Sequence, residues 1–132
     1  MSRLLDWRER LDALINHYRT APMVWGQTDC CQFALAAVRA LTGVDHAHLF
    51  PAYSSEREAL EIIVKAGGVA ALVRTALGES KHPSRARHGD IVLGGWGTGD
   101  ALGVCLGVES AVIVAGGIGF VRTLTAREAW TV

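Results

Sequence analysis

The sequence lacks a net charge, a long apolar run and the means to build a disulfide framework. Its 13 Lys and Arg residues balance 13 Asp and Glu residues, so no uniform field attracts nucleic acid or an anionic membrane. No apolar stretch approaches the ~20 residues that a membrane-spanning helix needs. The three cysteines are an odd number and two of them are adjacent, which favours free thiols. We therefore expect no nucleic-acid partner and no membrane insertion.

Motifs for metal, cofactor and secretion are also absent. There is no C-x-x-C or H-x-x-x-H spacing, which zinc sites typically have. The Gly-rich stretch 94–99 lacks the lysine of a phosphate-binding loop, and we interpret it as an exposed hairpin tip with Trp96 available for a partner contact. The first residues turn polar at once, unlike a secretory signal. We expect no metal, no cofactor and synthesis in a cytoplasm, and we interpret the basic cluster within 81–88 as a solvated loop.

The first part of the chain, about 1–80, has the patterns of helices. Apolar residues recur at three- and four-residue intervals between Leu4 and Tyr18, as on one face of a helix. A second helix is expected to begin at Asp29 or Cys30 and to end near residue 41. The S-x-x-E spacing at residues 55–58 predicts a third helix, which ends at the glycine pair 67–68. A fourth is expected around 69–77.

The second part changes to short apolar runs between frequent glycines, which is typical of buried strands and turns. We expect strands at 90–93, 102–108, 111–115 and 119–123, with turns at 109–110 and 116–117. The stretch 125–130 is expected to form a short helix or a docking tail, with Trp130 as its apolar partner contact. Residues 1–132 are thus predicted to form one α+β domain, with N-terminal helices packed on a C-terminal antiparallel β-meander of about 88–124.

The candidate site lies in the run Trp25-Gly26-Gln27-Thr28-Asp29-Cys30. Asp29 is suited to be the helix cap. Cys30 then falls at the first helical position, where the helix dipole and unpaired N–H groups lower the pKa of a thiol. Cys30 is therefore a candidate nucleophile. The alternative is a buried cysteine that only packs, which is common for this residue type.

The order of these motifs resembles the NlpC-like branch of the papain-type cysteine peptidases. The motifs are Trp25-Gly-x-x-Asp-Cys, the strand that begins with Gly89-Asp90, and Gly103-Val-Cys-Leu-Gly on the next strand. Over nearly its full length the chain is also similar to small phage and prophage proteins that combine Trp-Gly-x-x-Asp-Cys with Ala-Leu-Gly-Val-Cys. The resemblance implies a papain-like, NlpC-like fold with Cys30 at the position of the nucleophile.

The resemblance also implies a general-base histidine at the start of the second strand, where this chain has Ala101. A cysteine nucleophile in acyl transfer needs a base to hold the thiolate and an acid to protonate the leaving amine. His88, which directly precedes Gly89, is one candidate substitute. His46, in the loop after the cysteine helix, is another.

Two functions remain open. The first is a structural protein of a phage or prophage tail, in the tail-tip or assembly region, that keeps the peptidase fold without its activity. Its partners would be other tail proteins, and it would end in the virion tail. The second is an active cysteine hydrolase that cleaves cell-wall peptide in peptidoglycan with Cys30 as nucleophile. The missing histidine at Ala101 favours the first.

Overall fold

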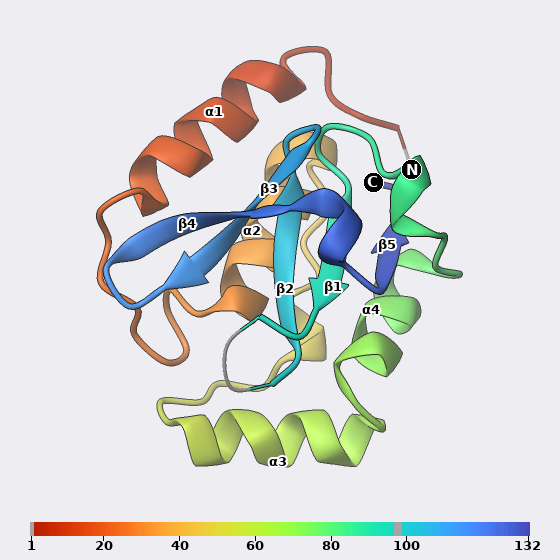
Figure 1. Cartoon of the computed structure of the whole chain (residues 1–132). Helices are drawn as coiled ribbons and strands as arrows, with labels where there is room; N and C mark the ends of the chain where they lie inside the picture. Colours follow the sequence, from red (N-terminus) through yellow and green to blue (C-terminus); the bar gives the residue numbers. More distant parts are fainter. Residues whose placement is uncertain (1, 97–98) are drawn as a thin grey trace.

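Helices and an antiparallel sheet divide the chain much as the sequence predicts (Figure 1). The computed structural model describes residues 2–96 and 99–132. Within these ranges the helices are α1 (Trp7–Tyr18), α2 (Cys30–Thr42), α3 (Glu56–Ala66) and α4 (Val69–Leu77). The strands are β1 (Ile91–Gly94), β2 (Ala101–Cys105), β3 (Glu109–Val114), β4 (Gly117–Arg122) and β5 (Glu128–Trp130). Short 3-10 turns η1 (Ala47–Leu49), η2 (Pro83–Arg85) and η3 (Thr123–Thr125) lie between them.

The ends of α2 are set by side-chain and glycine caps, as predicted. The Asp29 carboxylate accepts the backbone N–H of Gln32 at 3.1 Å, which satisfies one of the unpaired donors of the first turn. At the other end, Gly43 adopts φ 77° and donates its N–H to the carbonyl of Arg39. A left-handed residue there ends the helix with little strain because glycine has no Cβ.

The expected start of α3 at Ser55 is also confirmed, with one of the two hydrogen bonds of a capping box. Ser55 accepts the backbone N–H of Glu58 at 3.2 Å, and its hydroxyl also contacts the Glu58 carboxylate. Gly67, with φ 96°, ends the helix, and α4 begins directly after Gly68. No described helix is both long and apolar enough to cross a membrane.

The sheet has the strand order β4-β3-β2-β1-β5, and every neighbouring pair is antiparallel. Strands β1 to β4 form the predicted meander. The helices α1, α2 and α4 contribute to the core on one face of this sheet, and α2 runs behind β2 in Figure 1. A smaller apolar cluster covers the other face, where Val92 and Cys105 meet side chains of the loop segments and of β5.

The C-terminal stretch corrects two expectations. Residues 128–130 form strand β5 on the outer edge of β1, with Ile91 opposite Trp130, rather than a helix or a docking tail. The Trp130 ring is completely buried, and its indole N–H donates to the carbonyl of Gly78 at 3.1 Å. A partner contact at Trp130 is therefore wrong, because the chain's own core encloses the side chain. Three residues are too few for a strand pattern to be recognised in the sequence.

The hairpin turns also fall differently from their expected positions. Glu109 and Ser110 belong to β3, so the β2–β3 connection lies at residues 106–108. The β3–β4 turn lies at Ala115 and Gly116, one residue earlier than expected.

The Gly-rich tip is described only in part. Gly97 and Thr98 lie outside the described residues. Trp96, just before them, is half-buried: its indole N–H donates to the Thr125 hydroxyl at 3.0 Å, and its ring covers Gly94. A contact between Trp96 and a partner stays a prediction.

Candidate functional site

The sulfur of Cys30 lies where strands β2 and β3 part. Pairing between β1 and β2 continues to Ala101, whereas pairing between β2 and β3 stops at Gly103. The backbone N–H of Leu102 has no partner in the β2–β3 ladder, and it lies near enough to the Cys30 sulfur to lower the pKa of this thiol. The first turn of α2 is thus held against the beginning of β2. A sequence pattern could not have revealed the contact between Cys30 and Leu102, because the contact depends on where the pairing between β2 and β3 ends.

The two adjacent thiols have opposite protonation preferences. The pKa of Cys30 is lowered, first by a hydrogen bond from Cys31 and further by the backbone N–H groups of Leu102 and of Cys30 itself, while burial opposes the shift. The pKa of Cys31 is raised, because it gives its hydrogen bond to Cys30 and because it is buried. The shifts thus favour the charged form at the partly exposed Cys30 over the buried Cys31, which keeps its proton. The direction at Cys30 is the one expected for a cysteine at this helical position, but its first cause is the neighbouring thiol.

Asp29 is a structural cap, as predicted. Its carboxylate is 3% exposed and accepts hydrogen bonds from the N–H of Gly26 at 2.7 Å, the N–H of Gln32 at 3.1 Å and the hydroxyl of Tyr53 at 2.8 Å. Each oxygen already has a partner, so this side chain fixes the turn before Cys30. It is not placed to exchange a proton with a substrate.

Tyr53 is a site residue that the sequence patterns missed. Burial is the main cause that raises the pKa of its hydroxyl, and the neighbouring Asp29 also raises it, so it stays a hydrogen-bond donor. Its main-chain carbonyl approaches Gly26, where a Cβ would collide with it, and Gly26 has φ 83°. Only glycine fits there without strain. The two residues are far apart in the chain, and no local pattern links them.

His88 lies at the other end of β2 from Cys30. The N–H of Gly89, the next residue, donates to the carbonyl of Cys105 at 2.7 Å, whereas Cys30 contacts Leu102. Three residues of strand separate these points, which is about 10 Å. The His88 ring instead meets the edge of Trp7, with ring centroids 5.5 Å apart. The structure therefore does not bring His88 to the thiolate.

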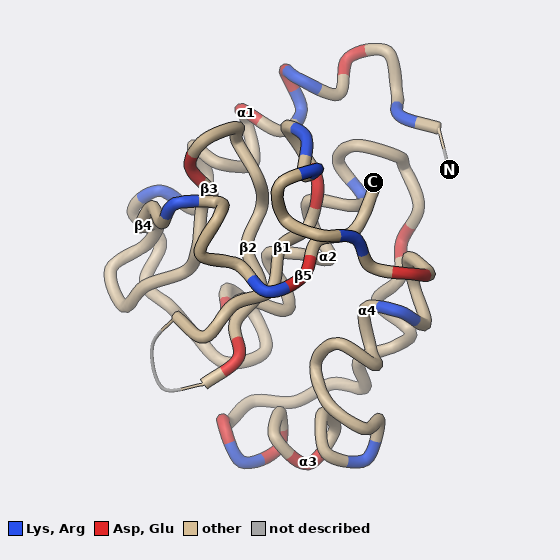
Figure 2. The backbone as a smooth tube through the Cα atoms, turned by 45° about the vertical axis from the view of Figure 1, so that its right-hand side comes forward, with Lys and Arg blue, Asp and Glu red and all other residues tan. Residues whose placement is uncertain are grey.

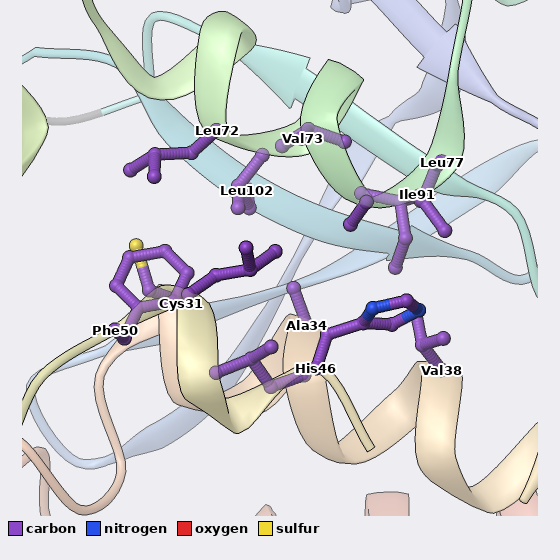
Figure 3. A pocket seen from close by; sticks show the side chains of 13 residues that line it. Cys31, Ala34, Val38, His46, Phe50, Leu72, Val73, Leu77, Ile91 and Leu102 are labelled. Carbon is purple, nitrogen blue, oxygen red and sulfur yellow. The ribbon is translucent and has the colours of Figure 1, made fainter. Parts of the chain in front are cut away.

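His46 lines a small apolar cavity below Cys31 (Figure 3). The cavity measures about 40 Å³ and lies between α2, α4, the segment around η1 and the strands β1 and β2. Figure 3 shows the His46 ring beside Ala34 and Val38, one to two turns along α2 from Cys31. Its Nε2 atom is buried without a hydrogen-bond partner among the described residues. No imidazole contributes to the lowered pKa of Cys30.

The remaining cysteine belongs to the core. Cys105 is completely buried, and its sulfur contacts the backbone of Gly107 and the hydroxyl of Thr123. Across residues 2–96 and 99–132, no three His, Cys, Asp or Glu side chains come together as they would around a metal ion.

The fold and this site together define an α+β protein in which a cysteine with a lowered pKa begins a helix beside the opening of an antiparallel sheet. The chain belongs to the family DUF6950, described as a domain of unknown function, whose family model matches residues 2–132. No curated protein matches the sequence.

Proposed function

We propose that the chain is a structural protein of a phage or prophage tail, in the tail-tip or assembly region, that has an NlpC-like, papain-like fold and no catalytic activity. The observation that supports the absence of catalytic activity is the identity of residue 101. The Leu102 N–H contacts the Cys30 sulfur, so residue 101 begins next to it, and that residue is alanine. The similarity to small phage and prophage proteins in the Trp-Gly-x-x-Asp-Cys motif supports the tail assignment.

The chemistry around Cys30 supports the absence of catalysis. Amide cleavage by a thiolate needs a group that protonates the leaving amine. The Cys31 thiol cannot do this readily, because its raised pKa holds its proton. A backbone N–H such as that of Leu102 stabilises charge but transfers no proton. The site thus keeps a nucleophile without its acid–base partner.

A structural role also explains the presence of Cys30 in a protein without catalytic activity. The contact of Cys30 with Leu102 joins the start of α2 to the start of β2. Under this proposal the protein is made in the host cytoplasm and enters the virion tail, with other tail proteins as its partners.

The alternative is a cysteine hydrolase that acts on cell-wall peptide in peptidoglycan. The lowered pKa and partial exposure of Cys30 favour it. It requires a base from outside the groups that now contact the thiol.

A Cys30→Ser variant in the encoding phage or prophage separates the two functions. We expect tails of normal appearance by electron microscopy and infectivity near that of the wild type, because a serine keeps the size of the side chain. Deletion of the gene is the control and should abolish tail assembly. Intact Cys30→Ser particles that fail to infect would contradict the structural role and favour the hydrolase. Normal tails after gene deletion would remove the tail assignment.

A further inference from the structure

Basic side chains from two distant segments surround a cavity at the end of the sheet where β1 begins. Arg3 and Arg8 come from the N-terminal part of the chain, and Arg87 and His88 come from the loop that leads to β1. The cavity measures about 390 Å³, and Trp7, Asp90 and residues 131–132 complete its lining. In Figure 2 several Lys and Arg segments lie around the C-terminus, at this end of the molecule. From the sequence, only the basic residues within 81–88 were recognised as a cluster.

One of these arginines builds the wall of the cavity. Arg3 donates to the carbonyl of Val132 at 2.8 Å, to the carbonyl of His88 at 2.7 Å and to the Asp90 carboxylate at 3.3 Å. The second oxygen of Asp90 accepts from Lys81 at 2.7 Å. Arg3 and Asp90 therefore hold the segments together, and neither has its charge free for a ligand.

The other two arginines are available. The Arg8 guanidinium lies over the Trp7 ring, 4.6 Å from its centroid, an arrangement that leaves the N–H groups at the edge of the guanidinium free. Arg87 is exposed. Among residues 2–96 and 99–132, no carboxylate pairs with either guanidinium. Two unpaired guanidinium groups on one concave site are suited to an oxyanion.

The imidazole in the cavity is affected by the same positive charge. The pKa of His88 is lowered, first by burial and then by the charge of Arg8, while Asp12 acts in the opposite direction with a larger effect than that of Arg3, which also lowers it. An anion bound beside these arginines would offset their effect and raise the pKa of His88.

We propose that this cavity binds the phosphate group of a small phosphorylated molecule, with Arg8 and Arg87 as its charged donors and His88 as a further donor. The Trp7 ring supports the arginines, since Arg3 and Arg8 lie over it at 4.3 and 4.6 Å from its centroid. The two guanidinium charges match the two charges of a phosphate monoester. The size lies at the lower end of the range for small-molecule pockets. A nucleic acid is a poorer fit, because the chain has no net positive charge and an extended polyanion is bound along a basic stripe.

Titration of the full chain with inorganic phosphate, followed by NMR of the His88 imidazole, tests this inference. We expect saturable shifts and a rise in the pKa of His88. Arg8→Gln and Arg87→Gln should each weaken the binding by about tenfold or more, the usual effect of losing one hydrogen bond to a charged group. Arg122→Gln, which removes an exposed arginine on β4, is the matched control and should bind as the wild type does.

Three outcomes would overturn the site. The first is an equal response to sodium chloride at the same ionic strength, which would mean general screening. The second is unchanged phosphate binding in both Arg8→Gln and Arg87→Gln. The third is binding of duplex DNA without saturable binding of phosphate, which would point to a polyanion surface. All three readouts are independent of Cys30 and therefore of the proposed function.

Discussion

Replacement of Asp90 by alanine is expected to lower the free energy of unfolding by about 3–5 kcal/mol, the usual cost of leaving one partner of a buried ion pair without the other. The carboxylate is 1% exposed and accepts four hydrogen bonds. The donors are the side chains of Arg3 and Lys81 and the backbone N–H groups of Arg87 and Val132. The truncation removes the acceptor that joins both ends of the described chain to β1. Since the side chains of Arg3 and Lys81 are 21% and 17% exposed, water solvates them in part and the lower value is expected.

Urea denaturation of Asp90→Ala and of Asp100→Ala measures this difference. Asp100 forms a comparably short ion pair with Arg127, 2.7 Å, but both side chains are about half exposed. Its removal should cost less than about 1 kcal/mol, as for surface ion pairs in general. Equal losses in the two variants would show that the Asp90 network does not fix the end of the sheet.

Replacement of Ala101 by histidine is expected to turn the thiol site into a weak esterase. Residue 101 directly precedes Leu102, whose N–H lies beside Cys30, and we expect an imidazole at this end of β2 to reach the sulfur around the open edge of the strand. With p-nitrophenyl acetate, Cys30 attacks the carbonyl carbon, p-nitrophenolate leaves, and water then cleaves the acyl thioester with the imidazole as base. General acid–base catalysis contributes about 10²–10⁴-fold in evolved sites, and about 10–100-fold faster turnover is expected in this unoptimised site.

Two controls assign this activity. The double variant Cys30→Ala/Ala101→His should lose it, because the nucleophile is gone. Val108→His, at a side chain that is 75% exposed, reports on the effect of a surface histidine and should leave turnover at the wild-type rate. Ala101→His with wild-type turnover would mean that residue 101 does not face the thiolate.

The helices could be predicted from the sequence because their signals are local. The cap at Asp29, the box at residues 55–58 and the left-handed glycines 43 and 67 all act within a few residues of the ends that they define. The positions of α3 and α4 follow from these signals almost to the residue.

The parts that could not be predicted depend on distant contacts. β5 is three residues long and is stabilised by its place beside β1. The hydrogen bond from Tyr53 to Asp29 and the position of His88 beside Trp7 join residues far apart in the chain. For the same reason, the loop position of His46 did not reveal that its ring enters an apolar cavity. Cys30 and its cap Asp29 could be identified from the sequence, whereas the backbone N–H of Leu102 beside the Cys30 sulfur could not.

The most direct test of a held thiolate without a histidine partner is the pH dependence of iodoacetamide alkylation at each cysteine, measured by mass spectrometry. Only the thiolate reacts, so the rate rises as pH passes through the pKa in the folded protein. We predict that Cys30 has a midpoint below the ~8.5 of a free thiol, that His46→Ala and His88→Ala leave it unchanged, and that Cys31 and Cys105 react only after unfolding. A midpoint at or above the ordinary value would contradict the held thiolate. A midpoint that rises when either histidine is removed would identify that residue as a base and contradict the inactive site.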